Sequence, residues 1–320
     1  MVSSILRLLL VAGVLGSGLP AQAPVPPAQP VPVQQQPPAE IPGMQPQWAN
    51  QVVFGIKPSA ADPGVKDFDN PNIIVYKKDV APHAQLAVFL PGTGGTPWMY
   101  DLMLHCIANQ GYRTVGLMYD DTPPGTDICP KLDPSSWAQF REERIFGDAP
   151  SGPFYNSREE SIVNRLVMLL RWLNQRYPRQ NWGSYLAGDE PDWSRILISG
   201  QSQGAGMAAY IAKREMVARV VLFSSPWDYH VPGYSAAPWL YEHAETPPDR
   251  WYAAYHRREA TAPLIAQAYE ALQIPENHVL VFDLEIPDWL KAYSNPYHGN
   301  VTANPSYIPQ WQHMFGTSPQ

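Results

Sequence analysis

The chain has 320 residues, of which 45% are hydrophobic and 16% are charged, so it can bury a full-sized core and is no disulfide-dependent miniprotein. Its 22 basic and 29 acidic residues give a formal net charge of −7, without the basic excess that phosphate backbones require. We therefore expect no nucleic-acid partner.

Residues 1–23 have the layout of a secretory signal peptide. Arg7 precedes an apolar run over residues 8–15, and small residues lead to Ala21-Gln22-Ala23. The run is shorter than the roughly 20 residues of a membrane-spanning helix. We therefore expect an exported protein, secreted or periplasmic, without stable membrane insertion.

Residues 24–46 form a Pro- and Gln-rich segment with nine prolines and a single charged side chain. This composition has too few apolar side chains to build a core, and it favours polyproline II. We predict a linker over 24–46, followed by a single domain over 47–320.

The rest of the chain alternates short apolar runs with helical patterns, which is typical of an α/β fold with a mainly parallel sheet. Strands are predicted at 51–56, 73–76, 86–90, 113–119, 195–199, 220–223, 250–255 and 278–284. Helices are predicted at 98–110, from 162 to about 178, at 205–215 and at 260–272. Ser157 and Glu160 have the spacing of a capping box ahead of the helix that begins at Ile162.

The segment Gly200-Gln201-Ser202-Gln203-Gly204 lies between a predicted strand and a predicted helix. This is the nucleophile-elbow pattern, in which a tight turn pushes the serine out of the sheet and the glycines avoid Cβ collisions. The N-terminus of the following helix favours the negative charge that develops in acyl transfer. Ser202 is therefore the predicted nucleophile.

Other site classes fit the sequence less well. From Gly204 the chain also matches the G-x-G-x-x-A pattern of dinucleotide sites, but Gly200 already makes the turn off the strand, so close packing of the helix explains the small residues better. Neither H-E-x-x-H nor paired C-x-x-C occurs. We expect no cofactor and no metal.

At these residues the chain resembles the α/β-hydrolase superfamily, over roughly residues 50–315. Pro91-Gly92-Thr93-Gly94-Gly95, the elbow and Ser224-Ser225-Pro226-Trp227-Asp228 are similar to a poorly characterised group of exported bacterial serine hydrolases in that superfamily. The resemblance implies an α/β-hydrolase fold, with helices on both faces of a mainly parallel central sheet. It also implies a catalytic triad in the chain order Ser, acid, His.

The remaining site residues follow from this resemblance. His298, beyond the last predicted strand and in a predicted loop, is the expected base. Two acids stay open: Glu259 follows the strand at 250–255, and Asp228 follows the strand at 220–223. The oxyanion hole is expected to use the N–H of Gln203 together with that of Thr93 or, failing that, Gly94.

Cys106 and Cys129 are the only cysteines. An even pair in an exported chain favours one disulfide, although two buried free thiols are the alternative.

An aromatic, Pro-rich stretch over 229–241 is expected to wall the active site, with Trp98 and Trp289 as further candidates. The sequence thus predicts a serine hydrolase, of esterase or lipase type, acting on a small or polymer-linked ester through an acyl-enzyme. A catalytically silent relative that binds a ligand or cell-wall polymer, and a serine peptidase, are the alternatives. The oligomeric state is not predicted.

Overall fold

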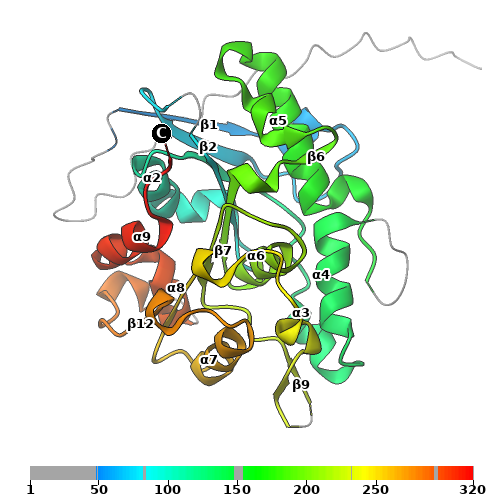
Figure 1. The fold of residues 1–320 in the computed structure, drawn as a ribbon, viewed down its shortest axis with the longest axis vertical. Helices are drawn as coiled ribbons and strands as arrows, with labels where there is room; N and C mark the ends of the chain where they lie inside the picture. Colours follow the sequence, from blue (N-terminus) through cyan, green and yellow to red (C-terminus); the bar gives the residue numbers. More distant parts are fainter. Residues whose placement is uncertain are drawn as a thin grey trace, which may run out of the picture.

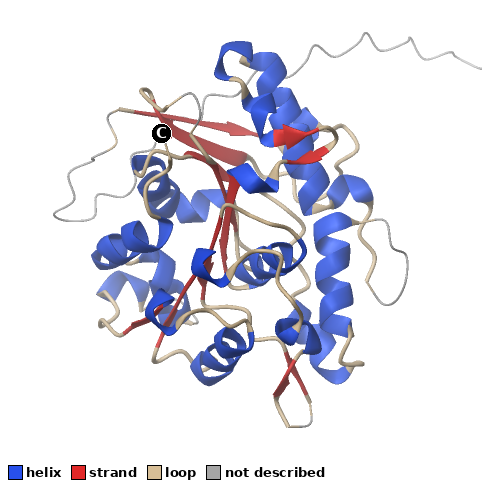
Figure 2. Ribbon diagram, viewed as in Figure 1, coloured by secondary structure: helices blue, strands red, loops and turns tan. Residues whose placement is uncertain are grey.

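The computed structural model describes residues 48–319 except 49, 82–83, 148–153, 232 and 292–294. Its centre is an eight-stranded sheet, drawn in red in Figure 2. Across the sheet the strands are, in order, β1 (Gln51–Ile56), β2 (Asn72–Lys77), β4 (Arg113–Gly116), β3 (Leu86–Leu90), β7 (Ile196–Gln201), β8 (Arg219–Phe223), β11 (Trp251–His256) and β12 (Val279–Phe282). β2 runs antiparallel to both neighbours, and every other pairing in this sheet is parallel.

Helices cover both faces of the sheet. The α-helices of the described residues are α1 (Pro58–Ala61), α2 (Asp101–Asn109), α3 (Gly125–Ile128), α4 (Ser136–Phe146), α5 (Ile162–Arg176), α6 (Gln203–Arg214), α7 (Ala262–Ala271), α8 (Pro296–Ala303) and α9 (Ile308–Phe315). In Figure 1, α2, α8 and α9 lie on one side of the sheet and α4 and α6 on the other. Two short hairpins, β5 (Leu186–Ala187) with β6 (Glu190–Pro191) and β9 (Tyr229–His230) with β10 (Ser235–Ala236), lie outside the main sheet. This arrangement confirms the α/β-hydrolase fold expected from the sequence.

The core is divided in two by the sheet. Because successive strand residues point to opposite faces, Ile74 of β2 belongs to the apolar cluster that includes residues of α4, α5 and α6, whereas its neighbours Ile73 and Val75 belong to the cluster that includes residues of α2 and α9. All three side chains are buried. The fully buried strands explain why the sequence shows continuous apolar runs there rather than alternation.

The predicted Cys106–Cys129 disulfide is wrong. Both cysteines are free and buried. Cys106 belongs to the apolar cluster on the α2 face of the sheet, and Cys129 belongs to the cluster on the opposite face. A disulfide requires Cα atoms within about 7 Å of each other, and the sheet separates these two side chains.

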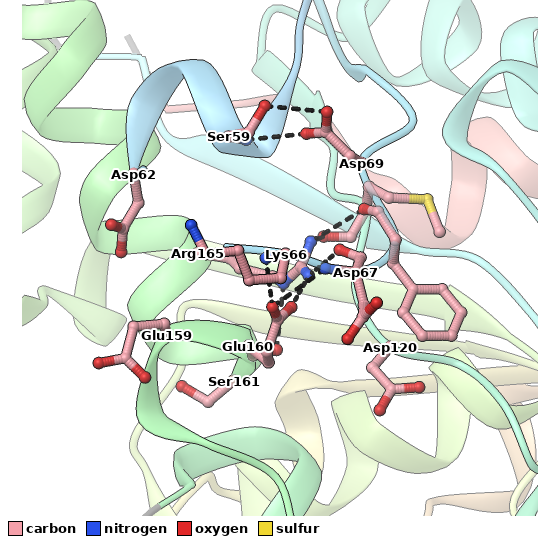
Figure 3. Close-up of polar contacts among 12 residues, drawn as sticks. Ser59, Asp62, Lys66, Asp67, Asp69, Asp120, Glu159, Glu160, Ser161 and Arg165 are labelled. Atoms are coloured by element: carbon pink, nitrogen blue, oxygen red, sulfur yellow. Dashed lines mark hydrogen bonds and ion pairs between the residues drawn. The ribbon is translucent and has the colours of Figure 1, made fainter. Parts of the chain in front are cut away.

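The predicted capping box at the start of α5 is also wrong. Ser161, not Ser157, caps the helix, because its side chain accepts a hydrogen bond from Asn164 N at 3.2 Å. Glu160 is used elsewhere: Figure 3 shows its carboxylate contacting the backbone of Lys66 and Asp67 and the guanidinium of Arg165. A buried arginine needs a charged or polar partner. Glu160 therefore pairs with Arg165 instead of capping the helix.

The predicted signal peptide at 1–23 and linker at 24–46 lie outside the described residues. Within the described ranges, no helix combines the length and the apolar composition needed to cross a membrane.

Candidate active site

The turn between β7 and α6 holds Ser202 in a conformation that few non-glycine residues adopt. Its φ is 54° and its ψ is −126°, and backbone of this kind persists only where the surrounding structure enforces it. The Ser202 N–H donates to Phe223 O of the neighbouring strand β8 at 2.9 Å. Because α6 begins at the next residue, Gln203, the serine stands between a strand end and a helix N-terminus.

Gly200 and Gly204 permit this turn through close backbone approaches. A Cβ on Gly204 would lie 2.1 Å from Leu90 O of β3, and a Cβ on Gly200 would lie 2.4 Å from the carbonyl carbon of Gly204. Such contacts are far inside the van der Waals limit. Both positions therefore need glycine so that α6 can pack against the sheet behind Ser202.

Glu259, at the end of β11, is buried and lies against His298. Its Oε2 is 2.7 Å from His298 Nδ1, and its Oε1 accepts hydrogen bonds from His256 N at 2.7 Å and Ser224 Oγ at 2.5 Å. These contacts fix the carboxylate, which in turn orients the imidazole and leaves its Nε2 to exchange a proton.

His298 lies in the first turn of α8 (Pro296–Ala303), so the loop predicted around it is wrong. Proline at the first position of a helix has the φ that the helix needs and gives up an N–H that would be unpaired there. The candidate base His298 therefore lies at the start of a helix. Trp227 packs edge-on against its ring, with centroids 5.2 Å apart.

Asp228 is paired with Arg141 instead of His298. The guanidinium donates to Asp228 Oδ2 at 2.7 Å and to Oδ1 at 2.5 Å, and Trp239 Nε1 donates to Oδ2 at 2.9 Å. Both members of this ion pair are buried. Because its oxygens are taken by Arg141 and Trp239, Asp228 makes no contact with the imidazole in the described part of the chain.

His256 contacts the carboxylate of Glu259 through its backbone N–H. Its Nδ1 accepts a hydrogen bond from Arg258 N at 3.1 Å, and its Nε2 lies 3.0 Å from Leu284 O, so Nε2 carries the proton. Burial lowers the pKa of this histidine, an effect that exceeds the stabilisation by Leu284 O and Glu259. The His256 ring is therefore neutral at neutral pH, and the residue contacts Glu259 by donating its backbone N–H.

Ser202 and His298 open into one cavity of about 250 Å³. Its lining residues are Thr93, Pro124, Gly125, Thr126, Trp137, Phe140, Arg141, Ser202, Gln203, Ser225, Trp227, Asp228, Asn295 and His298. No hydrogen bond joins Ser202 Oγ to His298 in the described residues; in ligand-free enzymes such contacts are often long or poorly aligned and tighten when substrate binds. Nor does any group of three or more His, Cys, Asp or Glu side chains in these ranges form a metal site.

The candidate oxyanion donors lie on two sides of Ser202. Thr93, in the loop after β3, and Gln203, at the start of α6, both line the cavity, whereas Gly94 is not among its lining residues. In this loop Tyr100 Oη accepts a hydrogen bond from Gly92 N at 3.0 Å and donates to Gln201 Oε1 at 2.8 Å. Burial raises the pKa of Tyr100 to about 12, so the hydroxyl stays protonated as a donor at neutral pH.

The aromatic walls of the cavity differ from the expectation. They come from Trp137 and Phe140 of α4 and from Trp227, and none of the described residues of 229–241 lines the cavity. Trp239 is instead buried in the core, where its ring packs on Tyr210. Aromatic content alone does not say which way a side chain points, so the prediction that residues 229–241 wall the active site is wrong.

Sequence reasoning missed Tyr100 and Arg141. Tyr100 lies in the short 3₁₀ turn Pro97–Tyr100, where the sequence predicted only a helix, and Arg141 lies in the charged helix face of α4. The run Arg141-Glu142-Glu143-Arg144 reads as a solvated surface. A buried arginine in such a run has no local signature, because its partner Asp228 is 87 residues away.

No protein-family model matches this chain, and no curated relative matches it. Among solved structures, esterase B from Lactobacillus rhamnosis is 14% identical, with 83% of this chain and 84% of that chain covered and a TM-score of 0.46. A bacterial heroin esterase is 15% identical over 84% of this chain and 83% of its own, with a TM-score of 0.43. A hyperthermophilic esterase from the archaeon Pyrobaculum calidifontis is 14% identical over 82% of this chain and 85% of its own, with a TM-score of 0.41.

Proposed function

We propose that this protein is a serine hydrolase that cleaves carboxylic esters through an acyl-enzyme on Ser202. The observation that carries the proposal is the combination of a strained Ser202 and of His298, held by buried Glu259, in one cavity. A turn with a purely structural role would not require a strained backbone at a serine that faces a cavity. The same three residue types in this order perform acyl transfer on this fold.

In the proposed reaction, Ser202 Oγ attacks the ester carbonyl carbon while His298 Nε2 accepts its proton. The N–H groups of Gln203 and Thr93 stabilise the oxyanion of the tetrahedral intermediate. The intermediate then expels the alcohol, which takes the proton from His298 and leaves Ser202 acylated. A water molecule, deprotonated by the same imidazole, releases the acid and restores the serine.

The cavity favours a short or compact acyl group. Its volume of about 250 Å³ is smaller than the roughly 300–1,000 Å³ of sites for drug-sized ligands. Trp137 and Phe140 offer apolar contact, and the Arg141–Asp228 pair adds a polar surface. We therefore expect p-nitrophenyl esters of short acids to be cleaved faster than esters of long fatty acids.

A fluorophosphonate probe tests the nucleophile. It should label the wild-type protein and fail to label Ser202→Ala, which should also lose ester cleavage. Ser194→Ala is the matched control, because Ser194 is exposed and donates to Asp192 Oδ1; its labelling should equal that of the wild type. Equal labelling of Ser202→Ala would mean that the probe reacts at another residue and that Ser202 is not the nucleophile. A wild-type protein that neither reacts with the probe nor cleaves esters would be a ligand-binding relative. Faster cleavage of p-nitroanilides than of esters would make it a peptidase.

We also propose that the protein is exported, on the strength of the apolar run and the Ala21-Gln22-Ala23 site at its start. The N-terminal sequence of the native protein tests this. It should begin in the Pro-rich segment 24–46, and an intact residue 1 in a cytoplasmic fraction would contradict export.

A further inference from the structure

The carboxylate of Asp121 lies beneath the candidate oxyanion loop and belongs to none of the roles described above. Asp121 follows strand β4 and is 1% exposed. The backbone N–H groups of Gly94 and Gly95 face its carboxylate and lower its pKa, and its Oδ2 has no hydrogen-bond partner among the described residues. A buried carboxylate with an unpartnered oxygen is costly. We therefore looked to the loop that carries Thr93 for the interactions that offset the cost of burying this carboxylate.

The backbone of Asp121 holds the other candidate donor. Its carbonyl oxygen accepts a hydrogen bond from Gln203 Nε2 at 2.7 Å, and Gln203 Oε1 in turn accepts one from Gly125 N at 3.2 Å. The side chain of Asp121 thus anchors the loop that carries Thr93, and its main chain anchors Gln203. One residue connects both sides of the candidate oxyanion hole.

Thr93 is left as the loop residue whose N–H is unused. In the loop 91–95, the Pro91 carbonyl accepts from Tyr119 Oη at 2.9 Å, Gly92 N donates to Tyr100 Oη, and Gly95 N also donates to Gly92 O at 2.8 Å. In the described part of the chain, no such partner takes the Thr93 N–H. The loop is therefore held from beneath while one N–H stays available on the cavity side.

We propose that Asp121 is a positioning residue for ester hydrolysis: its ionised carboxylate aims the Thr93 N–H at the oxyanion by holding Gly94 and Gly95. This rests on the proposed function of Ser202. A carboxylate accepts two N–H bonds more strongly than a neutral group does. Protonation of Asp121 should therefore loosen the loop and weaken catalysis without emptying the cavity.

The surroundings of Asp121 place its ionisation in an accessible pH range. Burial raises its pKa to about 6, and the adjacent charge of Asp120 acts in the same direction. The N–H groups of the loop and the Arg144 guanidinium oppose this rise. Arg144 is itself engaged with Asp120 through an ion pair. Among the described residues, Tyr100 and Tyr119 also interact with Asp121, and burial keeps both hydroxyls protonated.

The test is the ratio of wild-type to Asp121→Asn kcat for a p-nitrophenyl ester, measured from pH 5 to pH 8. The asparagine retains an acceptor oxygen but never ionises. At pH 8 we expect the variant to lose about tenfold to a hundredfold in kcat, below the 10²–10³ of deleting an oxyanion donor, with KM nearly unchanged. As the pH falls through about 6, the ratio should fall toward one, because protonated Asp121 then resembles asparagine.

Three controls make the result decisive. Asp127→Asn makes the same chemical change at an exposed position of α3, and its ratio to wild type should stay near one at every pH.

A ratio for Asp121→Asn that does not change with pH, or equal kcat at pH 8, would overturn the proposal. If Ser202→Ala keeps its turnover, the proposed function fails, and this inference with it; if only the pH dependence is missing, the function stands. If Asp121→Asn does not fold, the pH profile of the wild-type protein tests the proposal. Below about pH 6 its kcat/KM should fall more steeply with pH than the protonation of a single group allows.

Discussion

At the scale of single residues, the choice of acid depends on which partner each carboxylate already has. Glu259 contacts His298 through its Oε2, whereas both oxygens of Asp228 accept hydrogen bonds from Arg141. A carboxylate that neutralises a buried guanidinium cannot also orient an imidazole elsewhere. The two acids should therefore differ in kind, one affecting turnover and the other affecting stability.

Substituting the two acids separates these effects. Glu259→Gln should lose on the order of 10²–10⁴ in kcat, because the amide favours the wrong imidazole tautomer, with its melting temperature near that of the wild type. Asp228→Asn should lose much less kcat but should be less stable by about 3–5 kcal/mol, because it leaves Arg141 buried and unpaired. Steady-state kinetics and thermal unfolding on both variants check this. If instead Asp228→Asn were inactive and fully stable, the acid would be Asp228.

At the scale of elements, the four predicted helices are present as α2, α5, α6 and α7 with shifted ends, whereas α4, α8 and α9 were not predicted. The helix expected over 98–110 is a 3₁₀ turn, Pro97–Tyr100, followed by α2 (Asp101–Asn109), and the strand expected over 113–119 ends at Gly116. Residues 117–119 are still buried, so apolar character alone did not distinguish paired strand from buried extended chain. Element ends depend on caps and neighbours rather than on periodicity.

The cap of α5 offers a direct comparison between pattern and geometry. Ser161→Ala removes the acceptor for Asn164 N and the donor to Arg158 O, and should lower the free energy of unfolding by about 1 kcal/mol. Ser157→Ala, at the position that the capping-box pattern favours, should change it far less, since the Ser157 side chain makes no cap hydrogen bond. Urea unfolding measures both. The opposite order of stabilities would restore the capping box, and neither change should alter kcat because α5 does not line the cavity.

At the scale of the whole molecule, the parallel strands bring distant residues to one edge of the sheet. Thr93, Asp121, Ser202 and Glu259 each follow the carboxyl end of a strand, β3, β4, β7 and β11 respectively. Parallel strands share that edge, which is where ligands bind in open α/β sheets. The same sheet keeps the two cysteines apart, since they lie on its opposite faces.

Thiol counting tests this separation. Burial raises the pKa of Cys106 and of Cys129 to about 12, so neither forms the reactive thiolate at neutral pH and the native protein should react slowly with a thiol reagent. After denaturation without reductant, two thiols per chain should react. Reductant should leave the melting temperature of the native protein unchanged. Finding no reactive thiol in the denatured, unreduced protein would restore the disulfide.

Local sequence patterns predict the fold class, the position of Ser202 between a strand and a helix, and the candidates Glu259, Asp228 and His298. These follow from local patterns: apolar runs, glycine spacing and chain order are readable within a few residues. The packed fold was needed to show that Glu259 contacts His298 and that Asp228 is paired with Arg141. It was also needed to show that Cys106 and Cys129 lie on opposite faces of the sheet, and that Asp121 lies against the loop that carries Thr93. Each of these depends on the direction of a side chain and on a partner far along the chain, which packing against the sheet sets and no local pattern encodes.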